Sequence, residues 1–245
     1  MVAETSLLAI DFRTLFVLTT GGRIERENDP DHSPGPRFWL AGCALGNVTG
    51  VRSDVSHNVA GEIAAIAATE PPFVDRNGRP KHFDRYVDLL SRDTTVVRQS
   101  LGLIYVLPHL LRYEHPVRLI SDHSREGRRL YTRLSAHGMP NQLAELGFRS
   151  VSDLWPPWCV ALVNGEVASV AFAARIAEAG AELGVATIKA YRGHGYAAAA
   201  VAGWSRSPTL QSRVLFYSTD QTNVSSQRVI QRLGLRFLGA SLRLS

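Results

Sequence analysis

The residues best suited to chemistry lie where an expected strand leads through a glycine-rich turn into an expected helix. The strand covers residues 184–189, Gly193 and Gly195 lie in the turn, and an alanine-rich helix covers 195–204. Glycines let a ligand approach the backbone closely, and the free N–H groups of a first helical turn attract an anion. The segment therefore predicts a pyrophosphate site. It is not a Walker P-loop, because the G-x-x-x-x-G-K-[ST] spacing is absent.

Two motifs follow one another along the C-terminal part of the chain. The first is R-x-x-G-x-A at 192–197, directly after a strand, and the second is N-x-x-S at 223–226, which opens a helix ending in L-G-L at 233–235. The first is similar to the [QR]-x-x-G-x-[GA] signature of the GNAT superfamily of acyl-CoA N-acyltransferases, and the second resembles that superfamily's other cofactor-side segment. The resemblance covers residues 155–245 and implies an acyltransferase that uses acetyl-CoA as cosubstrate.

The resemblance also implies which residues would hold the cofactor. The turn would bind the pyrophosphate through its backbone, and the edge of the preceding strand would pair with the pantetheine arm as it would with a peptide. Strands 184–189 and 214–219 would splay apart to admit the thioester, whose carbonyl the backbone amides near Ile188 would polarise. The cofactor-binding residues are then Ala186, Thr187, Ile188, Arg192, Gly193, His194, Gly195, Tyr196, Ala197, Asn223 and Ser226.

Direct transfer of an acetyl group to an amine needs a general base that deprotonates the ammonium. Glu182 is the expected base, because some GNAT members carry a catalytic glutamate at the start of the motif-bearing strand. Its spacing to Arg192 is about one residue shorter than in those members, which could turn the side chain to the other face of the sheet. A solvated carboxylate in a turn is the alternative interpretation of Glu182.

The leaving thiolate needs a proton from an acid or from water. Many members of the superfamily place a tyrosine seven residues after the motif asparagine, and this chain has Ile230 there. Ser226 is the expected catalytic substitute, with Ser225, Tyr217 and water as alternatives. The two serines could instead serve only as helix N-caps.

The order of expected elements predicts a mixed α/β (α+β) fold in which helices flank a mostly antiparallel sheet. Asn164-Gly165 is a strong hairpin signal, and it falls where the central hairpin of a GNAT fold belongs. Strands are expected at 7–20, 37–52, 102–107, 116–120, 158–163, 166–175, 184–189, 214–219 and 236–244, and helices at 56–69, 82–92, 124–138, 141–146, 195–204 and 224–233.

The N-terminal part is longer than a minimal GNAT core requires. We expect residues 1–110 to form an α/β module of uncertain role, which could be a degenerate second acyltransferase-like half, and residues 111–245 to form the acetyltransferase domain. If two halves pack together, the acceptor site should lie between them. Residues 28–36 are expected to be a surface connection, with a mobile lid as the alternative.

Composition narrows the class of protein. The chain has 245 residues, of which 45% are hydrophobic and 20% charged, as in ordinary globular domains. The net charge of +5 suits an anionic ligand. Two cysteines are too few for a disulfide framework or a cysteine zinc site, and no metal is expected. The apolar stretch Leu7–Leu18 contains Asp11 and Arg13 and is a poor membrane span.

These observations predict a cytoplasmic N-acetyltransferase that moves an acetyl group from acetyl-CoA directly to a primary amine of a small molecule. No nucleic acid or membrane partner is expected, and a homodimer is left open. A catalytically silent acyl-CoA-binding regulatory module and a protein or peptide N-acetyltransferase remain as alternatives. An arginine-rich nucleic-acid-binding protein is a third, which steeply salt-dependent DNA binding would support.

Overall fold

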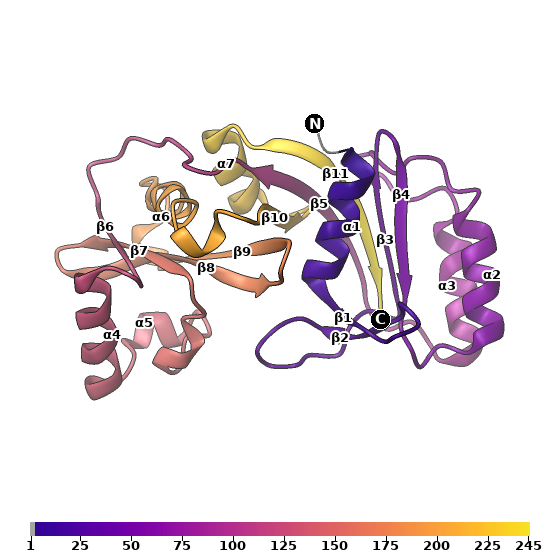
Figure 1. The fold of residues 1–245 in the computed structure, drawn as a ribbon, viewed down its shortest axis with the longest axis horizontal. Coiled ribbons are helices and arrows are strands. Elements are labelled where there is room, and N and C mark those ends of the chain that lie inside the picture. Colours follow the sequence, from indigo (N-terminus) through magenta and orange to yellow (C-terminus); the bar gives the residue numbers. More distant parts are fainter. Residues whose placement is uncertain (1–2) are drawn as a thin grey trace.

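The computed structural model describes residues 3–245 and is built around one large twisted sheet (Figure 1). The strands, in chain order, are β1 (Phe16–Leu18), β2 (Ile24–Glu27), β3 (Phe38–Cys43), β4 (Gly46–Val51), β5 (Gln99–Leu107), β6 (Arg118–Ser121), β7 (Trp158–Val163), β8 (Glu166–Ile176), β9 (Gly180–Thr187), β10 (Val214–Asp220) and β11 (Arg236–Leu244). Nine of them form the large sheet in the order β4-β3-β11-β5-β10-β9-β8-β7-β6, and β1 pairs with β2 separately.

Antiparallel pairing dominates the large sheet. Each neighbouring pair of its strands is antiparallel except β9 and β10, which are parallel. The expected fold class, a mixed and mostly antiparallel sheet flanked by helices, is therefore confirmed. The helices are α1 (Glu4–Leu15), α2 (His57–Ala67), α3 (Phe83–Asp93), α4 (Arg125–His137), α5 (Asn141–Ala144), α6 (Tyr196–Trp204) and α7 (Val224–Leu233).

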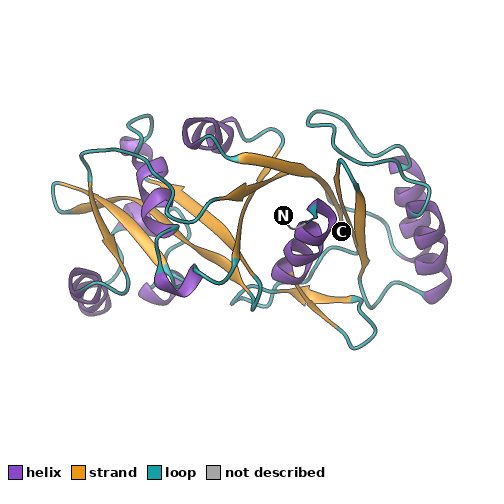
Figure 2. Cartoon of the chain, turned by 45° about the horizontal axis from the view of Figure 1, so that its top comes forward, coloured by secondary structure: helices purple, strands orange, loops and turns teal. Residues whose placement is uncertain are grey.

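Different helices cover the two faces of the sheet. Side chains alternate between faces along a strand, so on β10 Leu215 and Tyr217 pack in the cluster that includes α2, α3, α6 and α7, while Phe216 packs in the cluster of α1. The α4 and α5 side chains form a third cluster with Val170 and Phe172 of β8. Figures 1 and 2 both show β3 and β4 between α1 on one side and α2 and α3 on the other.

One strand from the N-terminal part runs through the centre of the sheet. β5 pairs with β10 along one edge and with β11 along the other, and β11 also pairs with β3. The sheet is therefore continuous across the two parts of the chain. The division at residue 110 and the degenerate second half stay predictions.

The strand expected at 7–20 is wrong. Residues 4–15 form α1, and only Phe16–Leu18 form a strand. The run is apolar almost throughout, so a short window fits either periodicity, but its buried residues follow helical spacing and include Leu7, Leu8, Asp11, Phe12 and Leu15. The error matters, because a helix places Asp11 on the same buried face as these apolar side chains.

Most other expected elements are confirmed. Asn164 and Gly165, with φ of 52° and 85°, form the turn between β7 and β8. Ser56 and Ser124 cap α2 and α4 by accepting backbone N–H groups. Strand β9 begins at Gly180, earlier than expected. Both cysteines are buried and free. Within residues 3–245, no helix has the length and apolar character needed to span a membrane.

Candidate active site

The two parallel strands of the sheet separate part-way along their length. Gly180–Glu182 of β9 pair with Val214–Phe216 of β10, and the pairing ends there. Beyond that point β9 continues against β8 as far as Thr187, while β10 continues against β5 as far as Asp220. The expected splay of these strands is confirmed. Glu182 is the last paired residue of β9 before the strands separate.

Two cavities of similar size lie beside this separation. The first, here called the α6 cleft, has a volume of about 500 Å³ and lies among β9, β10 and the N-terminal ends of α6 and α7. The second, the α1 pocket, has a volume of about 510 Å³ and is lined by α1, the β2 region and the strands of the sheet. Tyr217 lines the first cavity, and Glu182 and Ser218 line the second. Because side chains alternate along a strand, the neighbouring residues Tyr217 and Ser218 of β10 point to opposite faces of the sheet.

The α6 cleft gathers most of the residues that the sequence assigned to a cofactor. Its lining includes Ala186, Thr187, Arg192, Gly193, Gly195, Tyr196, Ala197, Asn223 and Ser226. Its charged lining residues are Arg192, Arg228 and Arg232, and no carboxylate lines it. No side chain caps the N-terminus of α6. Three guanidinium groups and the uncapped amides of a helix N-terminus make this cleft attractive to an anion.

The turn before α6 requires glycine at position 195. Gly195 has a φ of +86°, and a Cβ atom there would lie 2.7 Å from the Tyr113 hydroxyl and 3.2 Å from His115. His115 Nε2 is 2.8 Å from the carbonyl oxygen of His194, so the segment that carries Tyr113 and His115 packs directly behind the turn. The sequence analysis missed this support, since nothing local in the sequence relates residues so far apart.

Ile188 and His194 do not line the α6 cleft. The Ile188 amide donates to the carbonyl of Ala168 at 3.0 Å, and its side chain is buried. That amide is therefore already engaged and is not free to polarise a thioester as expected. His194 is exposed, its ring stacks on Tyr196, and its Nδ1 lies 2.9 Å from the carbonyl oxygen of Arg192.

Glu182 faces the α1 pocket, on the opposite side of the sheet from the α6 cleft. Its side chain is buried, with 4% of its surface exposed, so it is not a solvated turn carboxylate. Its Oε1 atom accepts a hydrogen bond of 2.8 Å from the Ser218 backbone N–H on β10, and its Oε2 atom has no partner. Burial raises the pKa of this carboxyl above its ordinary value of 4.5. A raised pKa brings a carboxylate closer to the range that a general base needs.

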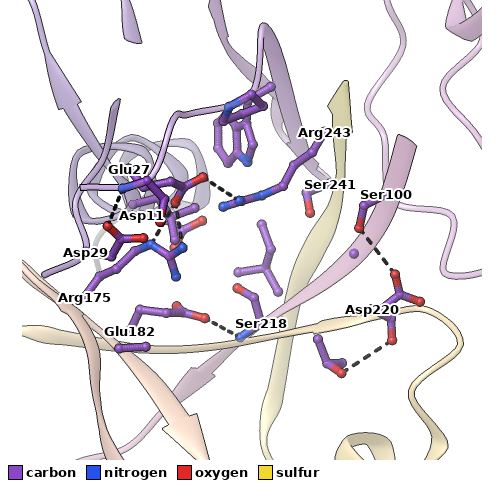
Figure 3. Close-up of a pocket in the computed structure, with 18 of the residues that line it drawn as sticks. Asp11, Glu27, Asp29, Ser100, Arg175, Glu182, Ser218, Asp220, Ser241 and Arg243 are labelled. Atoms are coloured by element: carbon purple, nitrogen blue, oxygen red, sulfur yellow. Dashed lines mark hydrogen bonds and ion pairs between the residues drawn. The ribbon is translucent and has the colours of Figure 1, made fainter. Parts of the chain in front are cut away.

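The α1 pocket contains charged residues that the sequence analysis did not single out (Figure 3). Glu27 accepts from Arg175 at 2.9 Å and from Arg243 at 2.8 Å, so two arginines neutralise this buried carboxylate. Asp11 is fully buried, and neither of its carboxyl oxygens has a partner. The signal for Asp11 was present in the sequence as a carboxylate within an apolar run, but it was used only to argue against a membrane span.

Comparison with known families identifies the C-terminal part of the chain. Residues 121–236 match the family model described as acetyltransferase (GNAT) domain. The chain carries a GNAT domain. This match includes both motifs, the separation of β9 and β10, and the N-terminus of α6. A search of the curated proteins gives no significant match.

Solved structures of GNAT proteins are similar to this chain at low identity. A GNAT-family protein of Novosphingobium aromaticivorans has 20% identity and a TM-score of 0.43 over 61% of this chain and 65% of that one. A GNAT-family acetyltransferase of Colwellia psychrerythraea has 17% identity and a TM-score of 0.42, with 65% and 60% covered. A GCN5-related N-acetyltransferase-like protein of Streptococcus suis has 17% identity and a TM-score of 0.45, with 89% and 86% covered. The chain thus spans less than two thirds of the first two structures, and the assignment of a GNAT domain to residues 121–236 rests on the family model.

The GNAT domain departs from its family pattern at Ile230, which is buried in the core on α7. The three side chains expected as substitutes, Tyr217, Ser225 and Ser226, all line the α6 cleft. Ser226 lies in the first turn of α7, where its N–H donates to the Asn223 side chain, so Asn223 and not Ser226 is the N-cap. The Tyr217 hydroxyl is buried and forms no hydrogen bond of normal geometry. Burial raises its pKa to about 12, and the neighbouring Ser226 side chain opposes that rise. That phenol therefore keeps its proton at neutral pH.

No metal centre is evident in the GNAT domain or in the rest of residues 3–245. Among these residues, no group of three or more histidine, cysteine, aspartate or glutamate side chains is arranged to hold a metal ion.

Proposed function

We propose that this chain is an N-acetyltransferase that moves an acetyl group from acetyl-CoA directly to the primary amine of a small molecule. One observation carries the proposal. Glu182 lies where β9 and β10 separate, with a free carboxyl oxygen on the α1 pocket, and the α6 cleft opens on the other face of the same strands. A base on one side of the gap and an anion site on the other are what direct transfer requires.

The α6 cleft has donor groups suited to an acyl-CoA. The amides of Tyr196 and Ala197, at the uncapped start of α6, are available to a pyrophosphate, and Arg192, Arg228 and Arg232 add positive charge around it. From Leu183 to Thr187, the edge of β9 that faces β10 pairs with no strand in the described part of the chain. An extended amide-bearing arm could pair there as a strand would. Acetyl-CoA would supply the acetyl group as an activated thioester.

The proton steps are assigned to two residues on opposite faces. Glu182 takes a proton from the ammonium, and the freed amine nitrogen forms a bond to the acetyl carbon while the carbon–sulfur bond breaks. Water takes the second proton that the nitrogen loses as the amide forms. Tyr217 or Ser226, in the α6 cleft, gives a proton to the departing sulfur and is restored from water. Overall, an ammonium and a thioester become an amide, a thiol and one released proton, so charge and atoms balance.

The α1 pocket is the proposed acceptor site. Its lining comes from both parts of the chain: α1 and residues 27–39 on one side, and β8, β9, β10 and β11 on the other. Four residues of the loop at 28–36 belong to that lining (Asp29, Ser33, Pro34 and Pro36). A volume of about 510 Å³ is in the range of small-molecule sites. Acyl-CoA is an intracellular metabolite, so we place the reaction in the cytoplasm.

Two measurements test the proposal. Calorimetric titration with acetyl-CoA, with desulfo-CoA and ATP as reference ligands, reports binding, and detection of released thiol with a panel of amines reports turnover. The proposal expects acetyl-CoA binding and amine-dependent thiol release. Acetyl-CoA binding without turnover by any amine or peptide would favour the silent regulatory module, and turnover of peptides alone would favour a protein N-acetyltransferase. Absence of acetyl-CoA binding would contradict the cofactor assignment itself.

A further inference from the structure

Asp11 is a buried carboxyl group that forms no side-chain hydrogen bond in the structure. It projects from α1 among Leu7, Leu8, Phe12 and Leu15, and its exposed surface is 0%. Both of its oxygen atoms lack hydrogen-bond partners, and the residue lines the α1 pocket. A buried carboxyl without partners costs folding free energy, because it loses its hydration and gains nothing in return. An apolar residue would fill the same place at a lower cost, so a ligand is the natural partner of this group.

The surroundings of Asp11 do not neutralise it. Glu182 faces it from β9 and carries the same charge, and the two arginines nearest to it, Arg175 and Arg243, are both bound to Glu27. Burial and the Glu182 charge raise the pKa of Asp11 well above its ordinary value, so the charged form of Asp11 is disfavoured unless a cation accompanies it. Figure 3 shows Asp11, Glu27, Arg175 and Glu182 grouped on one side of the pocket.

The pocket as a whole carries more carboxylates than arginines, although the chain is basic. Its lining contains five carboxylates and three arginines. Two of those arginines are bound to Glu27, which leaves Asp11, Asp29, Glu182 and Asp220 without an arginine partner and Arg98 as the remaining cation. Partial burial raises the pKa of Asp29, but hydrogen bonds that Ser33 donates lower it below its ordinary value, and hydrogen bonds that Thr222 donates lower the pKa of Asp220, so both carboxylates stay ionised.

We infer that the α1 pocket is a cation site for a small diamine, in which Asp11 binds an ammonium group of the acceptor beside Glu182. The inference rests on the proposed function and deepens it by naming the acceptor class. Asp29 and Asp220 favour an acceptor with a second ammonium group, and they disfavour an acceptor that carries a carboxylate at that end. Asp11 binds the ammonium as a carboxylate, and the bound cation replaces the hydrogen bonds that both of its oxygens lack.

Three amines of equal chain length test the acceptor class: 1,4-diaminobutane, butylamine and 4-aminobutanoate. With saturating acetyl-CoA, kcat/KM measured by thiol release should fall in that order, by at least about tenfold between the first and the last. Calorimetry should show that 1,4-diaminobutane binds the unmodified protein. Preference for 4-aminobutanoate would overturn the inference, and so would failure of 1,4-diaminobutane to bind.

The variant D11N tests the role of Asp11. It should raise KM for 1,4-diaminobutane at least about tenfold, while KM for acetyl-CoA stays unchanged and the melting temperature does not fall. E4Q, at the N-terminal end of the same helix, is the control: it removes a carboxylate that pairs with Arg236 at 3.2 Å and lines neither cavity, so both KM values should stay unchanged. An unchanged KM for the diamine in D11N would show that Asp11 is only structural. If acetyl-CoA does not bind either, the proposed function has failed, whereas normal acetyl-CoA binding confines the failure to this inference.

Discussion

The two cavities differ in charge although they flank the same pair of strands. Arginines are the charged residues that line the α6 cleft, beside an uncapped helix N-terminus, whereas carboxylates outnumber arginines in the α1 pocket. The sheet lies between them, and on β10 Tyr217 lines the α6 cleft whereas its neighbour Ser218 lines the α1 pocket. The difference teaches how one sheet can bring an anionic cofactor and a cationic amine together while it keeps their binding charges apart.

Glu182 marks the boundary between the two regions. One of its oxygens is held by the backbone of β10, and the other is free on the acidic side. One oxygen of Glu182 therefore fixes the side chain to the sheet, and the other is available to a ligand in the α1 pocket. If this comparison is right, substitutions on one side should change the kinetics of one substrate and spare the other.

The largest expected effect is that of E182Q. Loss of the base should lower kcat by roughly 10² to 10⁴-fold, while KM for acetyl-CoA remains unchanged because the α6 cleft is intact. In the unmodified protein, kcat/KM should fall as the pH drops through the raised pKa of Glu182, that is, at a higher pH than for an exposed glutamate. Steady-state kinetics over a range of pH measure both effects.

E178Q is the matched control for E182Q. Glu178 is an exposed carboxylate in the turn between β8 and β9 and lines neither cavity. Its replacement should change neither kcat nor KM. Full activity of E182Q would remove Glu182 as the base.

The next largest effect concerns the hydroxyl group in the α6 cleft that protonates the leaving thiolate. Y217F removes the buried phenol proton and should lower kcat by about 10²-fold, near the lower limit for an acid catalyst because water can also protonate the thiolate. The melting temperature should not fall, since the lost hydroxyl has no hydrogen-bond partner. S226A, measured in parallel, decides between the two hydroxyl groups. A normal rate for Y217F with a slow S226A would assign the proton to Ser226.

A smaller effect is expected at the N-terminus of α6. A197E places a carboxylate in the first turn of the helix, where the helix dipole favours it, but directly beside the proposed pyrophosphate. Acetyl-CoA should bind about tenfold more weakly and the fold should be at least as stable. A197Q, with the same shape and no charge, should bind nearly normally. Equal affinity in the two variants, measured by calorimetry, would mean that the pyrophosphate lies elsewhere.

The remaining expected effect is on stability and not on activity, and it concerns Asp11 in the α1 pocket. Because the folded-state pKa of Asp11 is raised above 3.8, the folded state keeps a proton that the unfolded state loses. The free energy of unfolding should therefore fall as pH rises above 3.8, by up to about 1.4 kcal/mol for each pH unit until the folded-state pKa is reached. D11N should lack this contribution. Urea unfolding at several pH values measures the difference, and parallel pH profiles for both proteins would contradict it.

The α6 cleft could be predicted from the sequence because its parts are local. The turn at 193–195, the helix after it and the cap at Asn223 depend on residues close in the chain, and nine predicted cofactor residues line one cavity. A glycine-rich turn before a helix favours anion binding in any fold, because the ligand can approach the backbone and the first N–H groups of the helix are free.

The α1 pocket could not be predicted, because long-range pairing creates it. It needs α1 against β9, β5 between β10 and β11, and Glu27 between Arg175 and Arg243. Interpreting residues 7–20 as a strand also hid Asp11, since a period of two separates residues that a helix places on one face. Only Glu182 was found in advance, and its face remained undecided until the pairing with β10 was known.

A crystal structure of the protein with bound CoA tests the central claim most directly. We predict that the pyrophosphate lies at the N-terminus of α6 near Ala197, that the pantetheine arm runs along the free edge of β9, and that the sulfur reaches the gap between β9 and β10 opposite Glu182. CoA in the α1 pocket, or bound away from the separation of the two strands, would contradict the account.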